Sequence, residues 1–203
     1  NKIYPKALVP LKSKNTFTLL ISVLLSAQCT DVNVNNVTKH IYPKYNQPEK
    51  FVKLGRKKIE KLIKSIGIFR IKAKSIYLMS KQILEKHNGK VPKTFEELEK
   101  LPGVGHKTAS VVMSQGFGYP AFAVDTHIHR LAQRWGLTKG KNVIQTENDL
   151  KRIFPKKTWS KLHLQIIFYG REYCKARECY GLTCTICTPC YRNRRKSVIT
   201  KQA

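Results

Sequence analysis

The sequence predicts an all-α protein, and three observations support this fold class. Apolar residues recur with helical spacing along most of the 203 residues. Glycine or proline stands at most boundaries between these apolar segments, where helices would end. No segment shows a convincing alternation of apolar and polar residues, so no β-strand is expected. With 41% apolar residues, the chain can build one large core or two small ones.

In chain order, the first element is an apolar run whose spacing suits a buried helix over residues 17–25. Helical periodicity predicts further helices over residues 34–42, 48–54, 56–66 and 71–87, and then over residues 126–136, 146–154 and 157–169. The sequence contains no internal repeat and no low-complexity linker, and a basic tail follows at residues 192–196.

Near the middle of the chain, the sequence predicts two helices joined by a tight turn. The first is expected over residues 95–101, after Thr94 as the N-cap and with Glu97 completing a capping box. Pro102 ends this helix because its ring cannot continue the helical hydrogen bonds. The second helix is expected over residues 106–115.

The turn between these two helices contains Gly103 and Gly105. We expect the glycines to supply positive φ values or a close backbone approach. The first amide N–H groups of the following helix have no intrahelical partners, and the helix dipole is positive there, so the turn suits a phosphate oxygen. This predicts DNA held through its backbone, without base contacts. The alternative is an ordinary turn between two packed helices.

An amine and a carboxylate follow this turn. Lys107 lies two residues after Gly105, and Asp125 opens the segment Asp125-Thr126-His127. Beside a phosphate-binding turn, such a pair is suited to covalent chemistry on a sugar carbon of DNA. The helix start, basic neighbours and partial burial are expected to favour the neutral, nucleophilic amine. Asp125 is also expected to cap the helix beginning at Thr126. The alternatives are a solvated helix lysine and an aspartate that only caps this helix.

The charge of the chain indicates the same kind of partner. The sequence has 39 lysine and arginine residues against 12 aspartate and glutamate residues, a formal net charge of +27. This excess goes beyond what solubility requires and predicts strong, salt-dependent binding to nucleic acid. A ribosomal or nucleoid protein would carry a similar charge, and a compositional bias of the source organism could contribute lysines. Such proteins rarely contain this much apolar helix.

The N-terminal region allows one competing interpretation, a secretory signal with lysines before the apolar run 17–25 and small residues after it. Thr18 and Ser22 interrupt this run, which is also too short to span a bilayer. Gln28 is also a poor residue before a lipid-modified cysteine. We therefore favour a buried helix and expect no membrane association.

Five of the six cysteines lie in the last thirty residues, at Cys174, Cys179, Cys184, Cys187 and Cys190. The two-residue gaps between the last three allow thiolates to turn back onto one metal ion or cluster. The group is therefore a local constellation and not a disulfide framework for the whole fold. Cys29 lies far away in the sequence and is expected to be a small buried hydrophobe.

These segments together resemble the endonuclease III family of DNA glycosylases. Residues 101–109 resemble that family's helix-hairpin-helix motif, and residues 123–127 resemble its Gly/Pro-Asp segment. Other segments that fall in the family's order and spacing are residues 17–35, 66–68 with Lys72-Ala73, 87–89, 139–143 and 170–174. The resemblance covers roughly residues 15–190, and its central motif is specific.

The resemblance implies two helical lobes with a DNA-binding cleft between them. The first would be a six-helix lobe over residues 15–120, which contains the helix-hairpin-helix. The second would combine residues 1–14 with residues 121–203 and would carry a Cys-rich iron-sulfur loop at residues 174–190. The amine and the carboxylate described above would lie at the mouth of the cleft.

The resemblance also assigns residues that contact DNA. Gln28 matches the residue that fills the hole left when the damaged nucleotide swings out, and Ile68 matches the wedge on the opposite strand. The other expected contacts are Leu101, Gly103, Val104, Gly105, His106, Thr108 and His127. His106 replaces the arginine common in the family, which removes a fixed charge near the phosphate. Without the resemblance, Gln28 is equally a helix-end amide and Ile68 a core residue.

The activity implied by the resemblance is base-excision repair, with removal of oxidised pyrimidines and cleavage of the strand at the abasic site. Lys107 would attack C1′ of the extruded sugar, and Asp125 would stabilise the developing positive charge and assist proton transfer. The resulting Schiff base permits β-elimination. The alternatives are a monofunctional helix-hairpin-helix glycosylase of the adenine or uracil type, which uses water, and a non-catalytic DNA-binding protein.

The expected partner is double-stranded DNA with damaged bases or abasic sites, bound by a monomer. The expected location is the cytoplasm of a bacterium, at its nucleoid, or the nucleus or an organelle of a eukaryote.

The family carries a [4Fe-4S] cluster on four cysteines, and this chain departs from the family's spacing. Cys174 matches the first ligand, and Cys184 and Cys187 match the central pair. Nine residues rather than six separate Cys174 from Cys184. We take Cys179, inside this gap, as the fourth ligand, with Cys190 as the alternative. A structural [4Fe-4S] cluster is favoured, with zinc second and a set of free thiols third.

Overall fold

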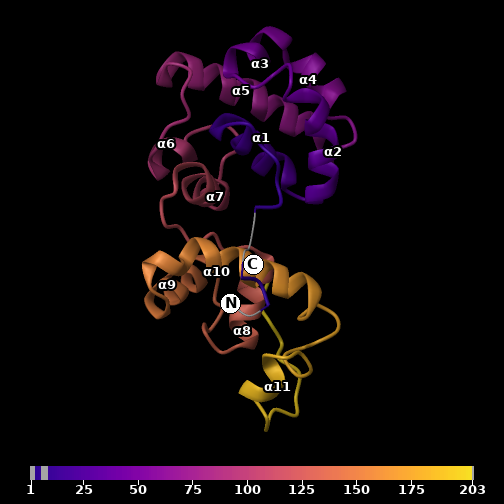
Figure 1. Cartoon of the computed structure of the whole chain (residues 1–203), viewed down its shortest axis with the longest axis vertical. Helices are drawn as coiled ribbons and strands as arrows, with labels where there is room; N and C mark the ends of the chain where they lie inside the picture. Colours follow the sequence, from indigo (N-terminus) through magenta and orange to yellow (C-terminus); the bar gives the residue numbers. More distant parts are fainter. Residues whose placement is uncertain (1–2, 6–8, 203) are drawn as a thin grey trace. The chain divides into compact units, whose positions relative to one another are not determined.

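The structure, a computed structural model, describes residues 3–5 and 9–202, and every regular element within them is helical. The predicted all-α fold class is therefore confirmed. The described helices are α1 (Thr16–Ser26), α2 (Asp31–Ile41), α3 (Pro48–Leu54), α4 (Arg56–Leu62), α5 (Phe69–His87), α6 (Phe95–Glu99), α7 (His106–Phe117), α8 (Thr126–Arg134), α9 (Val143–Ile153), α10 (Trp159–Glu172) and α11 (Cys187–Cys190), with the 3-10 turn η1 (Lys156–Thr158) before α10 (Figure 1).

Contacts between residues divide the chain into two compact units. The N-terminal unit comprises residues 9–119 and contains helices α1 to α7. The C-terminal unit comprises residues 120–202 together with the described residues 3–5, and contains helices α8 to α11. Each unit has its own cluster of buried apolar side chains.

Capping side chains set several helix starts. Thr94 Oγ1 accepts a hydrogen bond from the Glu97 amide at 3.3 Å, so the predicted N-cap is confirmed. α9 begins at Val143, three residues earlier than expected, because Asn142 Oδ1 accepts a hydrogen bond from the Gln145 amide at 2.8 Å. α4 ends at Leu62 and not at residue 66, because Ile63 leaves the helical conformation with φ −108° and ψ 21°.

In the N-terminal unit, α1 is the most buried helix and contacts α2, α5 and α7. The two polar residues inside its apolar run both have hydrogen-bond partners. Thr18 Oγ1 donates to the Asn15 carbonyl at 2.9 Å, and the Ser22 hydroxyl lies 2.6 Å from that of Tyr42. These bonds allow a polar interruption within a core helix. The described residues include no helix that has both the length and the apolar character to cross a membrane.

α7 approaches α1 closely at Gly116. A Cβ atom at this position would lie 2.8 Å from Thr16 Cγ2 and 3.3 Å from Leu19 Cδ2. The absence of a side chain at Gly116 therefore allows α7 to pack closely on α1.

In the C-terminal unit, α8 packs against α9 and α10. Its core includes the fully buried Phe122, Ile128, Leu131 and Leu150. Four cysteine side chains belong to the same buried cluster: Cys174, Cys179, Cys184 and Cys187. The core of this unit thus continues directly into the Cys-rich loop.

We expect Gly116→Ala to destabilise the protein, although alanine favours an ordinary helix over glycine by about 1 kcal/mol. The added methyl group would meet Thr16 and Leu19, and such overpacking costs about 1–3 kcal/mol. Denaturant unfolding followed by circular dichroism measures the change. Thr16→Ser removes the nearest methyl group, so the double variant should recover part of the lost stability. A stabilised Gly116→Ala variant would contradict this close packing.

Candidate functional site

The predicted helix-hairpin-helix is formed by α6, the turn over residues 100–105, and α7. Gly103 occupies the left-handed region with φ +81°. A Cβ atom there would lie 2.7 Å from Ser75 Cβ and 3.1 Å from Leu24 Cδ1. Both the backbone angle and the close packing therefore require glycine, as expected from the sequence.

Gly105 differs from Gly103. Its φ is −97°, which other residues adopt, and an added Cβ atom would meet nothing within 4 Å. The expectation of a positive φ or a close approach within the chain is therefore wrong for Gly105. Gly105 is the N-cap of α7 and has no side chain to cap the first amide groups. The start of α7 consequently presents an open surface at the positive end of the helix dipole.

Lys107 is the second residue of α7, and its side chain is exposed. The partial burial expected from the sequence is therefore absent. His106 is held at the surface by Glu99, whose Oε1 lies 2.7 Å from His106 Nδ1, and by stacking on Phe95. These contacts leave Lys107 extending from the helix start.

The remaining hairpin residues lie at different depths. Leu101 and Val104 are buried in the core, so only their backbone groups are available to a ligand. Thr108 is half-buried on the first turn of α7. The hairpin therefore offers a ligand mainly backbone groups and the side chain of Lys107.

Asp125 lies in the C-terminal unit, whereas Lys107 lies in the N-terminal unit. Asp125 is 9% exposed, and its Oδ1 accepts a hydrogen bond from the Ile128 amide at 2.8 Å. The predicted cap of α8 is confirmed. Only one carboxylate oxygen takes part in this bond, so capping leaves the other oxygen available for chemistry.

The two histidines after Asp125 have different partners. His127 Nδ1 lies 3.3 Å from Arg130 Nη2, and His129 Nδ1 lies 2.8 Å from Thr146 Oγ1. Burial lowers the pKa of His129. The two rings thus have separate partners, and His127 packs beside Arg130 near the start of α8.

Gln28 and Ile68 lie on adjacent loops of the N-terminal unit. Both are non-glycine residues in the left-handed region, with φ of 53° and 50°, and both side chains are exposed. A Cβ atom on Gly67 would lie 3.4 Å from the Gln28 carbonyl oxygen, so the two loops are close. Asn33 adds a hydrogen bond from Nδ2 to the Ser65 carbonyl at 3.1 Å. A β-branched residue with positive φ is strained, and such strain clusters at functional sites.

The structure brings together four of the five C-terminal cysteines. The sulfur atoms of Cys174, Cys179, Cys184 and Cys187 all lie within 4.8 Å of one another and are buried, whereas Cys190 is exposed. Four thiols at one point form a possible metal site. The set contains Cys179 and excludes Cys190.

The thiols of this cluster differ in acidity. Burial raises the pKa of Cys174 to about 12 and raises that of Cys187 as well. At Cys179, burial is outweighed by hydrogen bonds from the amides of Thr183 and Cys184, and the pKa falls to about 6. The loop thus directs backbone N–H groups at a sulfur, as in sites that hold thiolates.

Two cationic side chains of α8 are directed at this loop. Arg134 is 2% exposed, and its Nη1 donates to Cys174 Sγ at 3.3 Å and to the Lys175 carbonyl at 2.8 Å. Arg130 Nη2 donates to the carbonyls of Gly170 and Cys174, each at 3.0 Å. The Nε atoms of both arginines have no hydrogen-bond partner among the described residues.

Two such cations need negative charge nearby. Four thiolates around a centre of charge about +2 carry a net charge of about −2, which two guanidinium groups would balance. The donor set and its electrostatics therefore fit a bound metal centre.

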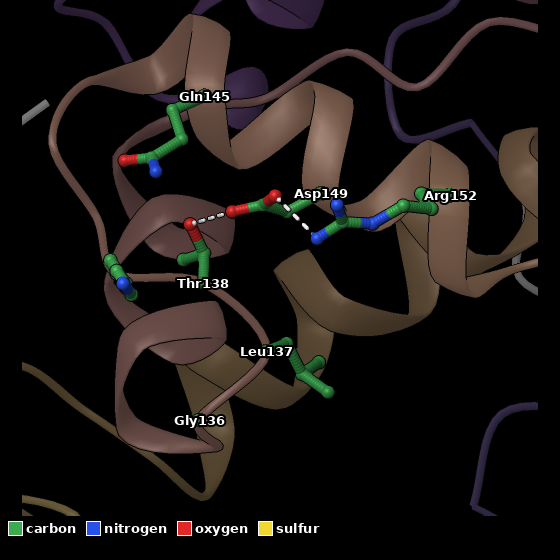
Figure 2. A pocket seen from close by; sticks show the side chains of 7 residues that line it. Gly136, Leu137, Thr138, Gln145, Asp149 and Arg152 are labelled. Carbon is green, nitrogen blue, oxygen red and sulfur yellow. Dashed lines mark hydrogen bonds and ion pairs between the residues drawn. The ribbon is translucent and has the colours of Figure 1, made fainter.

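A cavity of about 440 Å³ in the C-terminal unit is a second place for a ligand (Figure 2). Asp149, the acid that lines it, accepts hydrogen bonds from the Thr138 hydroxyl at 2.8 Å and from Arg152 at 3.1 Å (Figure 2). Both of its carboxylate oxygens are thus already paired, so Asp149 is a poor candidate for acid or base catalysis.

The sequence analysis did not select two buried cations, Arg134 and Lys72, and the half-buried Arg130. The sequence contained a signal for each. Arg130 and Arg134 are one helical turn apart, before a cysteine cluster that needs counter-charge. Lys72 lies four residues before Ile76 on the buried stripe of α5. A lysine on the buried stripe of a helix needs hydrogen-bond acceptors in the protein interior, because its charge is removed from water.

Comparison with known proteins identifies close relatives. The pattern of the family described as "HhH-GPD superfamily base excision DNA repair protein" matches residues 21–156. The endonuclease III of Bacillus subtilis is 44% identical over 195 residues, which cover 96% of this chain and 89% of the relative. The endonuclease III of Escherichia coli is 44% identical over 174 residues, which cover 86% of this chain and 82% of the relative.

A solved structure has a similar fold. It is a trapped covalent intermediate of endonuclease III with DNA, and it matches with a TM-score of 0.86 at 42% identity. The match covers 95% of this chain and 93% of that one. The similarity in sequence and in fold thus extends over nearly the whole chain.

The two hairpin glycines should respond differently to substitution. Gly103→Ala combines a positive φ with a collision against Ser75 and Leu24, and should lower the unfolding free energy by about 1–3 kcal/mol. Gly105→Ala meets no atom and keeps an allowed φ, so its stability should change by less than about 0.5 kcal/mol. Thermal unfolding of the matched pair checks this. Equal losses would show that the hairpin is packed differently.

Proposed function

Because the chain belongs to the endonuclease III family, within the HhH-GPD superfamily of base excision DNA repair proteins, we propose that Lys107 and Asp125 are its catalytic residues. The protein is an enzyme, a DNA glycosylase and AP lyase that binds damaged DNA. We further propose oxidised pyrimidines as its substrates. The observation that carries the assignment is the exposed amine of Lys107 on the first turn of α7, directly after the open glycine turn.

The hairpin binds the DNA backbone in this proposal. A phosphate oxygen can approach the first amides of α7 because Gly105 has no side chain and no neighbour fills the space above it. The positive end of the helix dipole attracts the anion. Leu101 and Val104 hold the turn in the core, and their backbone groups alone face the ligand.

Gln28 and Ile68 act on the duplex. Taking a nucleotide out of the stack costs a few kcal/mol, and a side chain that enters the vacated space offsets part of this cost. The exposed amide of Gln28 would fill the space beside the unpaired base, and the exposed Ile68 would separate the bases of the opposite strand. The neighbouring loops and strained backbones suit rigid presentation of both side chains.

Lys107 is the nucleophile. The neutral amine attacks C1′ of the extruded nucleotide, the bond from C1′ to the base breaks, and the base leaves with the bonding electrons and takes up a proton. The extruded nucleotide would exclude water from the amine, which the protein alone leaves exposed. The bond from C1′ to the ring oxygen O4′ then breaks, O4′ takes up a proton, and the opened sugar is joined to Lys107 as a Schiff base. Loss of the C2′ proton expels the 3′ phosphate, and water releases the product.

Asp125 stabilises the positive charge that develops on the sugar and takes part in the proton transfers. Its capping bond fixes the carboxylate, and the second oxygen stabilises positive charge on the sugar as the base departs. The same oxygen accepts and returns protons during Schiff-base formation. His127, beside Arg130 on the first turn of α8, would contact the DNA backbone.

The cysteine cluster holds a [4Fe-4S] cluster in this proposal, with Cys174, Cys179, Cys184 and Cys187 as ligands. Membership of the family and the two arginines of α8 support it. The group is structural and fixes the loop, since no step needs a redox reaction.

Zinc is the second candidate for this site, because of the short separations between the sulfur atoms. A tetrahedral site with Zn–S bonds of about 2.3 Å places the sulfur atoms about 3.8 Å apart, and the four sulfur atoms here all lie within 4.8 Å of one another. A larger iron-sulfur group would move them outward.

The Lys107→Gln variant tests the nucleophile. Borohydride should trap a covalent complex between the wild-type protein and DNA with an abasic site, and the substitution should reduce trapping at least ~10³-fold while binding persists. Lys90→Gln, which removes an equal charge from another exposed position of the N-terminal unit, is the control and should trap normally.

Two other outcomes of this experiment are informative. Base release by the wild-type protein without trapping or strand cleavage would indicate a monofunctional glycosylase. Equal binding of damaged and undamaged duplex with no chemistry would indicate a non-catalytic DNA-binding protein. Either result would refute the assignment of Lys107.

Matched cysteine variants test the ligand set. Cys179→Ser should lose most of the bound metal and lower the melting temperature, because a buried ligand is removed. Cys190→Ser should keep metal content and stability, because Cys190 is exposed and lies outside the cluster. Iron, acid-labile sulfide and zinc analyses of the purified proteins measure the outcome. Metal loss in Cys190→Ser alone would reverse the assignment of the fourth ligand.

A further inference from the structure

Lys72 is a buried lysine on the first turn of α5, with only 4% of its surface exposed. Its Nζ donates hydrogen bonds to the carbonyl of Leu25, at 2.9 Å, and to that of Ala27. Burial lowers the pKa of Lys72, and no carboxylate is paired with it among the described residues. The cation is thus held by backbone carbonyl groups alone.

These carbonyl groups lie at the C-terminal end of α1. The last carbonyls of a helix have no intrahelical partners and form the negative end of its dipole. The ammonium group therefore caps α1 and compensates for its own desolvation. A neutral side chain of the same length would leave the carbonyls of Leu25 and Ala27 without this donor.

The position of Lys72 connects the two strained residues. Its side chain bonds to Ala27, directly before Gln28, and its own amide donates to the Ile68 carbonyl at 3.2 Å. Lys72 is therefore hydrogen-bonded to both loops, next to Gln28 in one and at Ile68 in the other, where the backbone φ is positive. Such conformations cost about 1–3 kcal/mol each and persist only where the surroundings enforce them.

We infer that Lys72 is a positioning residue, which holds Gln28 and Ile68 in the geometry that enters the duplex during nucleotide extrusion. The inference rests on the proposed function, because it assigns Lys72 a part in extrusion and none in the chemistry at C1′. It predicts that Lys72 matters where a nucleotide has to leave a duplex. The residue should matter little where no duplex has to be opened.

The experiment compares two substrates with the same protein. The first is a duplex with one oxidised pyrimidine, and the second is a single-stranded oligonucleotide with an abasic site. Lys72→Met should lower the single-turnover cleavage rate on the duplex at least ~10-fold, because small displacements of positioning groups have effects of this size. Borohydride trapping on the single strand should stay within about twofold of wild type.

Matched variants separate positioning from general damage to the fold. Lys74→Met removes an exposed lysine from the same helix and should behave as wild type on both substrates. Lys72→Gln keeps a hydrogen-bond donor and should fall between wild type and Lys72→Met; it also serves if the latter does not fold. In a Gln28→Ala, Ile68→Ala background, Lys72→Gln should have little further effect on the duplex rate, since coupled residues are not additive.

The outcomes distinguish the two proposals. Equal losses on both substrates, or an unchanged duplex rate in Lys72→Met and Lys72→Gln, would overturn the positioning role while leaving Lys107 as the nucleophile. Absence of trapping by the wild-type protein on either substrate would overturn the proposed function itself, and the role of Lys72 with it.

Discussion

Cations that are buried or half-buried and bonded to backbone carbonyl groups organise both units of this protein. Lys72 joins the end of α1 to the start of α5, and Arg130 and Arg134 join α8 to the Cys-rich loop. Each cation loses water contacts on burial, and hydrogen bonds to oriented carbonyl oxygens replace them. This exchange is favourable only if the carbonyl groups keep their geometry. These contacts therefore hold neighbouring segments rigidly. Of the residues proposed to act on DNA, Gln28 and Ile68 lie beside Lys72, and His127 lies beside Arg130. The fold and the function depend on the same acceptor geometry.

The two glycines of the hairpin have different roles. Gly103 serves the fold, because its φ of +81° and its contacts with Ser75 and Leu24 admit no side chain. Gly105 has no such constraint within the chain, and its open surroundings suit the approach of a ligand. The turn can thus be stable without DNA and still leave the start of α7 accessible. In the proposed mechanism, the exposed Lys107 becomes nucleophilic when the substrate surrounds it.

The C-terminal unit combines an apolar core with a thiol cluster. Its four buried cysteines are part of the same core as Ile128 and Leu131, so the proposed metal centre and the packing would stabilise one structure. The guanidinium groups of the half-buried Arg130 and the buried Arg134 would be costly without the negative charge of a thiolate site. Loss of the proposed metal centre would therefore affect α8, which also begins with the cap formed by Asp125. The carboxylate that we propose as catalytic and the Cys-rich loop are thus connected through one short helix.

The sequence by itself determined most of the helices, two of their caps and the hairpin, because these depend on spacing and on residues close along the chain. Thr94 and Asp125 were predicted as caps from their positions alone, and both bonds are present. Tertiary structure decided which of several residues of the same type is buried or belongs to the site. Cys179 and Cys190 both had suitable spacing, and only the path of the loop brings Cys179 into the cluster. Lys72 and Lys74 are both helix lysines in the sequence, yet packing against α1 buries only Lys72. Burial depends on neighbours distant in sequence, which local patterns do not specify.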